Sequence, residues 1–294
     1  MSPAEHFADR LAAAVEAKGA PLCVGLDPVL ARLPSALARQ DPAAAFERFC
    51  CEIVDAVCGV AVAVKPQAAC FEALGSSGVA AFERVCDHAR AAGLLVVADA
   101  KRGDIATTAR GYAAAFLEPR PDGGPLADAL TVNPYLGGDS LEPFLAACRA
   151  HGRGIFCLVK TSNPGGADVQ DVRLADGRPL WQHVASLVER WGRDLVGSRG
   201  LSAVGAVVGA THPAAVEVAR RLLPRAVLLL PGVGAQGATV ADAAPAFAGQ
   251  PAGGLVTVSR PILYAHETAG GDWRAAAAAA AARLAGELRA LAGG

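Results

Sequence analysis

The sequence predicts a (β/α)8 barrel, a closed ring of parallel strands in which each strand is followed by a helix. Eight short and continuously apolar runs occur along the chain, and stretches of helical pattern separate them. Apolar runs of this kind are typical of a parallel sheet covered on both faces, and a count of eight favours a closed barrel. Because such barrels contain about 250 residues or more, we expect residues 1–294 to form one domain.

The expected strands are β-branched apolar runs that stop at a polar residue or a glycine. They are Leu22 to Leu26, Val60 to Val64, Leu94 to Ala98, Ala129 to Val132, Ile155 to Val159, Val204 to Val208, Ala226 to Leu230 and Leu255 to Val258. The expected helices between them are Pro42 to Cys58, Val79 to Ala92, Asp104 to Leu117, Leu141 to His151, Leu180 to Arg193 and Pro213 to Leu223. Residues 1–19 also have a helical rhythm, and the alanine-rich end of the chain predicts a closing helix.

One insertion interrupts the regular alternation. Residues 161–201 separate the fifth and sixth strands, and we expect an irregular loop there followed by a helix. The alternative fold is a doubly wound open sheet, which typically has GxGxxG after its first strand. The first strand here continues into GLDP instead. GVGAQG, from Gly232 to Gly237, follows the seventh strand, where barrels often bind phosphate.

Charge and composition exclude several classes of partner. The chain has 27 basic and 28 acidic residues, so we expect it to bind neither nucleic acid nor a membrane surface. The apolar runs are too short to cross a bilayer, and the first residues lack a signal peptide's apolar stretch. We therefore expect a cytoplasmic protein with a small-molecule substrate.

Cysteine and histidine spacing gives no metal signature. The eight cysteines include no CxxC pair, and the six histidines include no HExxH motif. A chain of this length does not need disulfide bonds, and several cysteines lie in or beside apolar runs. We expect core cysteines and no bound metal.

Polar side chains follow six of the expected strands. They are Asp27, Lys65, Asp99 with Lys101, Asn133, Lys160 with Ser162, and Arg260. Each has a local explanation by itself, such as a turn cap or a solvated lysine. Catalytic residues of such barrels lie at the carboxyl ends of the strands, and burying six unrelated polar groups together would be costly. These residues therefore predict a catalytic site.

The densest cluster is the segment DAKRGDI, which contains Asp99, Lys101 and Asp104. Asp99 and Lys101 are two residues apart and lie on one face of an extended segment. Asp104 precedes a helical pattern in which Thr107 or Thr108 could present a hydroxyl. A purely local alternative makes Asp104 an N-cap and leaves Lys101 in solvent.

Alternating carboxylates and ammonium groups keep one another charged. A lysine held in this way can donate a proton and stabilise a developing carbanion. A neighbouring aspartate would repel a substrate carboxylate, which is a secondary and contested effect.

These motifs resemble the orotidine 5′-monophosphate decarboxylase family in its longer bacterial form. DAKRGDI resembles the family's DxKxxDI signature, and further similar motifs occur in order along most of the chain. They are VGLDP, VKPQ, TVNPYLGGDS around Asn133, VKTSNPG, PGVGAQG and VSRPI. The resemblance implies decarboxylation of orotidine 5′-monophosphate to uridine 5′-monophosphate, the last step of de novo UMP biosynthesis, without a cofactor.

The same resemblance implies roles for individual residues. Lys65, Asp99, Lys101 and Asp104 would form the charged network, with Lys101 protonating pyrimidine C6. Substrate contacts are implied for Asp27 and Lys65 at the ribose, Ser162 at the pyrimidine, Gln236 and Arg260 at the phosphate, and Thr108 near the ribose phosphate. A loop from Pro231 to about Ala244 would close over the phosphate.

The resemblance also implies a homodimer, because Asp104 and Thr108 reach the neighbouring subunit's site in that family. It gives Lys160 no role, so a solvated or structural lysine is expected there. Two other functions are considered. One is a magnesium-dependent sugar-phosphate decarboxylase or lyase of the same barrel superfamily, and the other is a non-catalytic phosphate-binding barrel.

Overall fold

Eight parallel strands form a closed barrel, which confirms the predicted fold class. The computed structural model describes residues 5–121 and 123–293. Each strand pairs with the next one along the chain, and β8 returns to pair with β1. The strands are β1 (Leu22–Leu26), β2 (Ala63–Pro66), β3 (Leu95–Arg102), β4 (Ala129–Val132), β5 (Gly154–Lys160), β6 (Ser202–Val208), β7 (Ala226–Leu230) and β8 (Gly254–Val258).

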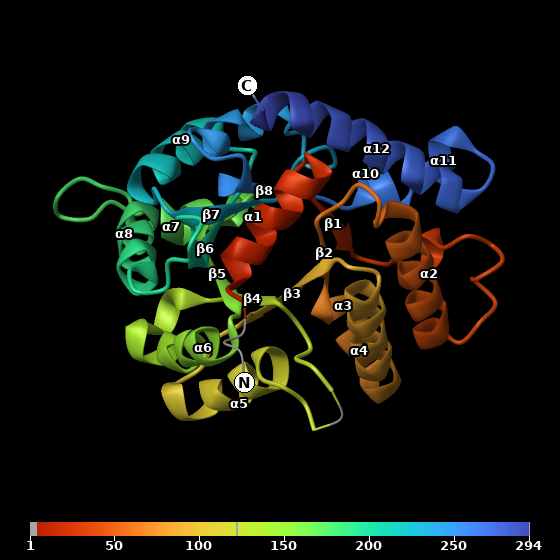
Figure 1. Cartoon of the computed structure of the whole chain (residues 1–294), viewed down its shortest axis with the longest axis horizontal. Helices are drawn as coiled ribbons and strands as arrows, with labels where there is room; N and C mark the ends of the chain where they lie inside the picture. Colours follow the sequence, from red (N-terminus) through yellow and green to blue (C-terminus); the bar gives the residue numbers. More distant parts are fainter. Residues whose placement is uncertain (1–4, 122, 294) are drawn as a thin grey trace.

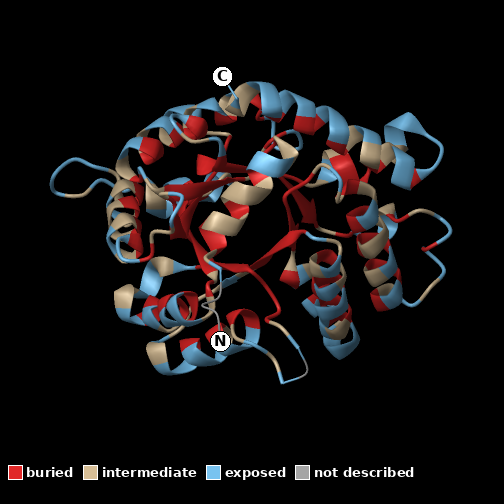
Figure 2. Ribbon diagram, in the orientation of Figure 1, coloured by how far each residue is buried: buried red, intermediate tan, exposed pale blue. Residues whose placement is uncertain are grey.

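Helices surround the barrel, and Figure 2 shows the strands buried inside this layer. The longer ones after the N-terminal helix are α2 (Pro42–Val57), α4 (Gly75–Ala91), α5 (Ala106–Leu117), α6 (Gly138–His151), α8 (Leu180–Gly192), α9 (Pro213–Leu222) and α12 (Trp273–Ala292). The start of α2 follows from its sequence. Asp41 accepts hydrogen bonds from the Ala43 and Ala44 amides, and Pro42 fits the first helical turn, which does not need its missing N–H.

The N-terminal helix α1 (Phe7–Lys18) crosses one end of the barrel in Figure 1. Its apolar side chains pack against the first residues of several strands. Phe7 packs edge-to-face on Phe156 of β5, with ring centroids 5.9 Å apart. Gly154 is required beside it, because a Cβ there would lie 2.3 Å from the Phe7 ring. This helix closes the amino end of the barrel and leaves the carboxyl end available for a site.

The second strand begins later than the sequence pattern predicts. Its expected range was Val60 to Val64, whereas β2 runs from Ala63 to Pro66. The amides of Val60 and Ala61 still bond to the Val57 carbonyl, so these residues form the turn that ends α2. Because Val60 and Ala61 are apolar like the residues of the strand, apolar character alone does not separate the turn from the strand. The shift places Lys65 inside the strand instead of just after it.

Residues 161–201 between β5 and β6 contain several short elements. They are η3 (Pro164–Gly166), α7 (Ala167–Gln170), a narrow hairpin in which Arg173 pairs with Pro179, and then α8. The expected loop followed by a helix is therefore partly ordered by its own hydrogen bonds. Within residues 5–121 and 123–293, no helix has both the length and the hydropathy needed to cross a membrane.

Candidate active site

Two adjoining cavities occupy the carboxyl end of the barrel. The larger has a volume of about 480 Å³, and the smaller has about 120 Å³. They share Lys65, Pro231 and Gln236 in their walls. Strand ends from around the barrel supply the charged residues that line the larger cavity, and residues 161–170 supply much of the rest of its lining. The two cavities together can hold an extended ligand with chemically different ends.

Asp99 lies at the centre of the polar network in the larger cavity. One carboxylate oxygen accepts hydrogen bonds from the Lys65 ammonium and from the Gln67 amide, the latter at 3.2 Å. The other oxygen accepts from the Lys101 ammonium at 2.5 Å and from the Thr131 hydroxyl at 3.0 Å. Both lysines are therefore held by one buried carboxylate.

Burial and charge act in opposite directions on these groups. Burial by itself would raise the pKa of Asp99, but the charges of Lys65 and Lys101 outweigh it and hold that pKa well below its usual value. Burial would likewise lower the pKa of Lys65, while Asp99 and Asp27 raise it above the usual value of a lysine. Asp99 and Lys65 are both charged at neutral pH.

The backbone at Lys101 departs from the extended geometry expected of it. Lys101 has a φ of 47°, and the pairing of β3 with β4 shifts register between Ala98 and Arg102. The Lys101 amide donates to Thr131 Oγ1 at 2.9 Å, which helps to hold this bulge. The expectation of a simple alternation was therefore wrong here, although the ammonium still reaches Asp99. Positive φ is costly for a residue with a side chain and is often found at functional sites.

Asp27 and Arg260 line the smaller cavity together with Gln236. Oδ1 of Asp27 is buried, and no described residue gives it a hydrogen bond. Arg260 follows β8 and is exposed at the cavity wall. A buried acceptor without a donor is costly unless a ligand or water supplies one, so Asp27 is suited to accept from a hydroxyl group.

The loop after β7 forms one wall of the smaller cavity. Gly234 has a φ of 81°, and a Cβ there would lie 2.7 Å from Cγ of Pro261 in the segment after β8. Its amide bonds to the Ala238 carbonyl at 2.8 Å, which turns the chain back. Glycine at this position thus lets the loops after β7 and β8 approach each other closely, beside Arg260.

Three predicted site residues lie outside these cavities in the single chain. Asp104 accepts a hydrogen bond from the Ile105 amide at 2.7 Å and makes no bond to either lysine. Thr108 is exposed on α5. Asn133 accepts from the Tyr135 amide at 3.0 Å and begins η2 (Pro134–Leu136). Ser162, in contrast, lines the larger cavity.

Gln67 and Thr131 are site residues that the sequence analysis missed. Thr131 is almost completely buried within β4, and both residues bond directly to Asp99. A signal for Thr131 was available, because it is the one hydroxyl inside the apolar run of the fourth strand. Gln67 follows Lys65 by two residues and continues the same polar end of β2.

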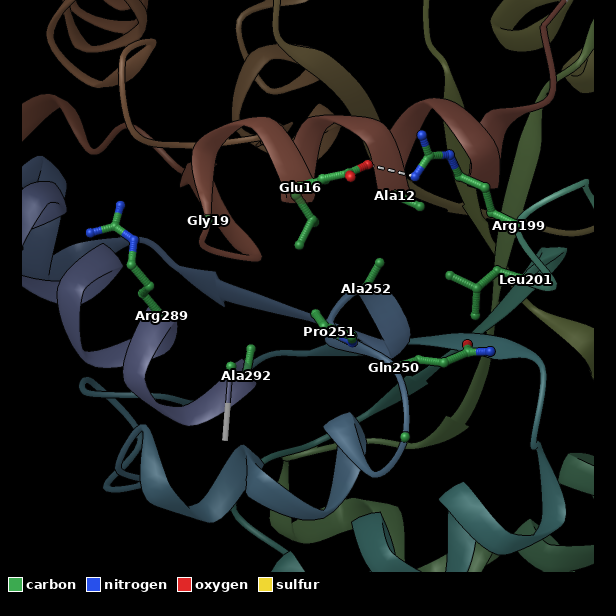
Figure 3. A pocket seen from close by; sticks show the side chains of 13 residues that line it. Ala12, Glu16, Gly19, Arg199, Leu201, Gln250, Pro251, Ala252, Arg289 and Ala292 are labelled. Atoms are coloured by element: carbon green, nitrogen blue, oxygen red, sulfur yellow. Dashed lines mark hydrogen bonds and ion pairs between the residues drawn. The ribbon is translucent and has the colours of Figure 1, made fainter.

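A further cavity lies elsewhere in the fold. It has a volume of about 540 Å³ and is lined by α1, the end of α12 and the segment before β8 (Figure 3). Its walls are mainly apolar, and Arg199 there is already paired with Glu16 at 2.8 Å. It lies at the amino end of the barrel, away from the strand ends where such barrels carry their chemistry.

Comparison with known proteins identifies the family. The model described as "Orotidine 5'-phosphate decarboxylase / HUMPS family" matches residues 20–273. The chain belongs to the orotidine 5′-phosphate decarboxylase / HUMPS family. All ten residues predicted for the site lie within the matched region.

Relatives of this family match most of the chain. Two proteins named orotidine 5′-phosphate decarboxylase are similar to it: the one from Rhodopirellula baltica is 48% identical over 89% of both chains, and the one from Roseiflexus castenholzii is 47% identical over 90% of both. A solved structure of Leishmania donovani OMP decarboxylase has a TM-score of 0.78 at 34% identity, covering 98% of this chain and 100% of that one.

Proposed function

We propose that this chain decarboxylates orotidine 5′-monophosphate to uridine 5′-monophosphate, the last step of de novo UMP biosynthesis. The relatives are named for that activity, and the chain matches them over almost their whole length. The observation that carries the proposal is the Lys65–Asp99–Lys101 network at the carboxyl end of the barrel. It places a cationic proton donor next to a carboxylate that stays charged.

The proposed reaction needs only this fixed charge. The bond between C6 and the carboxylate carbon breaks, carbon dioxide leaves, and the electron pair remains on C6. The Lys101 ammonium stabilises this charge and then donates its proton to C6. Lys65 and Thr131 hold Asp99 in place, so the network is organised before the substrate arrives. Repulsion of the substrate carboxylate by Asp99 adds a smaller contribution.

The two cavities suggest how the nucleotide is held. The pyrimidine occupies the larger cavity beside Ser162, and the phosphate lies in the smaller cavity near Gln236 and Arg260. At the ribose hydroxyls, Asp27 accepts a hydrogen bond and Lys65 donates one. Binding of the phosphate, which takes no part in bond breaking, can then contribute to positioning the reacting carbon. The loop from Pro231 to about Ala244 closes over the phosphate in this account.

We also propose a homodimer with shared sites, completed by Asp104 and Thr108 of the second subunit. Large apolar side chains are exposed around Asp104: Ile105 is 59% exposed and Tyr135 is 80% exposed. The loops after β3 and β4, which contain Ile105 and Tyr135, lie side by side, because the Asn133 amide bonds to the Arg102 carbonyl at 2.8 Å. An exposed apolar patch of this kind marks an interaction surface.

A cytoplasmic location is also proposed. All eight cysteines are free thiols, and burial raises the pKa of Cys23 to about 12, which makes that thiol unreactive. Free cysteines in this number are typical of proteins from a reducing compartment.

The test is loss of orotidine 5′-monophosphate absorbance in the ultraviolet, measured with purified enzyme in EDTA. We expect turnover that is unchanged by the chelator, with uridine 5′-monophosphate as product. Activity that is lost in EDTA and restored by magnesium would favour the rival sugar-phosphate chemistry. Absence of any turnover would favour a non-catalytic barrel.

A further inference from the structure

We infer that Lys160 and Asp171 form a clamp that holds residues 161–172 against the substrate cavity, and that Lys160 is a positioning residue for substrate binding. The inference rests on the proposed function for the identity of the substrate. Lys160 ends β5, which belongs to the rigid barrel, and Asp171 follows α7 in the insertion. One ion pair therefore connects the scaffold to the segment that lies over the cavity.

The geometry of this ion pair favours a specific role over a solvated lysine. The Lys160 side chain is 8% exposed, and its ammonium donates to both carboxylate oxygens of Asp171 at 2.8 Å. Burying a lysine costs free energy, and a single carboxylate provides the compensation here. The expectation of a solvated lysine at this strand end was wrong, whereas a structural lysine agrees with the geometry.

A second set of bonds joins the same two ends of the segment, one residue further in. The Gln170 side chain accepts from the Thr161 amide at 2.9 Å and donates to the Thr161 hydroxyl at 2.7 Å. Residues 161–170 are thus closed into a compact loop, and the ion pair attaches this loop to β5. Without the ion pair, the loop would retain its internal bonds and its chain connection through Thr161 but lose the side-chain attachment of Asp171 to β5.

The segment forms part of the binding site. Ser162, Gly166, Val169 and Gln170 all line the larger cavity, as do Lys65 and Asp99. Val169 is 48% exposed there, so an apolar group faces the space proposed for the pyrimidine. When such a wall is held in place before binding, the ligand does not have to supply the free energy of ordering it. Loosening the wall should therefore weaken substrate binding more than the chemical step.

The test compares Asp171→Asn, Lys160→Met and the double variant with the wild type. Met approximates the buried length of Lys160, and Asp171 is 46% exposed and can be hydrated when unpaired. We expect each single change to raise KM for orotidine 5′-monophosphate by about tenfold, with kcat changed by less than about threefold. The double variant should be no worse than the single ones, because all three lack the same ion pair.

Asp168→Asn is the matched control, since Asp168 is an exposed carboxylate on the same α7. It should leave KM unchanged. Hydrogen exchange of the unliganded proteins is the second readout, and we expect faster exchange in residues 161–172 of the clamp variants only. This readout does not depend on the substrate, so it decides the clamp even if wild-type enzyme fails to decarboxylate orotidine 5′-monophosphate. The inference would be overturned if Asp171→Asn had the KM and the hydrogen exchange of the wild type. It would also be overturned if Asp168→Asn changed KM and exchange as much as the clamp variants do.

Discussion

The ammonium of Lys65 donates a hydrogen bond to the carboxylate of Asp99, and both side chains are buried beneath the carboxyl end of the barrel. Neither group would be stable there as an isolated charge. Lys101 bonds to the other oxygen of Asp99 from the solvent side and is 45% exposed. The buried pair therefore serves as a fixed support for a lysine that can still meet a ligand.

Replacing Asp99 with Asn should destabilise the protein and abolish activity. The change leaves the Lys65 charge buried without its main partner, which we expect to cost about 3 to 5 kcal/mol of unfolding free energy. Chemical denaturation and the turnover assay measure the two effects. Asp168→Asn removes an exposed carboxylate and should change stability by less than about 0.5 kcal/mol. An Asp99→Asn protein with wild-type stability would contradict the role given to this ion pair.

The same pair predicts a pH dependence of stability. The pKa of Asp99 is below its ordinary 3.8 in the folded protein. Its contribution to the free energy of unfolding is therefore present above pH 3.8 and is lost as the pH falls through the pKa of the folded state. The pKa of Lys65 is above its ordinary 10.5 in the folded protein. Its contribution to the free energy of unfolding is therefore present below pH 10.5 and is lost as the pH rises through the pKa of the folded state.

We therefore expect the difference in unfolding free energy between wild type and Asp99→Asn to be constant from about pH 5 to 9 and to shrink in stronger acid. Denaturation curves at a series of pH values measure it. A difference that varies steeply near neutral pH would show that another ionisation controls the pair.

Arg260→Ala should weaken use of the phosphorylated substrate specifically. Removal of a charged hydrogen-bond donor at the smaller cavity should lower kcat/KM for orotidine 5′-monophosphate by about 10- to 100-fold. The nucleoside orotidine, which lacks the phosphate, should react equally slowly with variant and wild type. If both substrates lose the same factor, Arg260 acts on something other than the phosphate.

Mixing two inactive variants tests the shared site. Lys101→Ala and Asp104→Ala subunits, once exchanged, should recover about a quarter of wild-type activity. Half of the randomly exchanged dimers are mixed, and each mixed dimer contains one complete site. Exchange should be followed independently, for example with one tagged variant. Full exchange without recovered activity would mean that Asp104 acts within its own chain or not at all.

Much of the fold could be predicted because each strand is a local apolar run. The expected ranges of the first, fourth and seventh strands match β1, β4 and β7 at every residue. The start of β2 could not be predicted, since the turn before it is equally apolar and only pairing with β1 distinguishes the two. The short α7 has little pattern of its own and depends on contacts made by Gln170 and Asp171.

The sequence could predict which residues gather at the site, but it could predict their backbone conformation and hydrogen bonds less well. Placing Asp99 and Lys101 at one strand end required only the order of the elements. The positive φ at Lys101 and the hydrogen bond from its amide to the Thr131 hydroxyl arise from pairing between β3 and β4, which are distant in sequence. Lys160 was left without a role because its partner is 11 residues away across an irregular loop.

The most direct test of the account is the turnover of Lys101→Ala with orotidine 5′-monophosphate, measured next to its unfolding free energy. The account predicts that decarboxylation falls below detection while the variant stays folded and still binds uridine 5′-monophosphate. Near-normal turnover by this variant would contradict the proposal that Lys101 delivers the proton to C6.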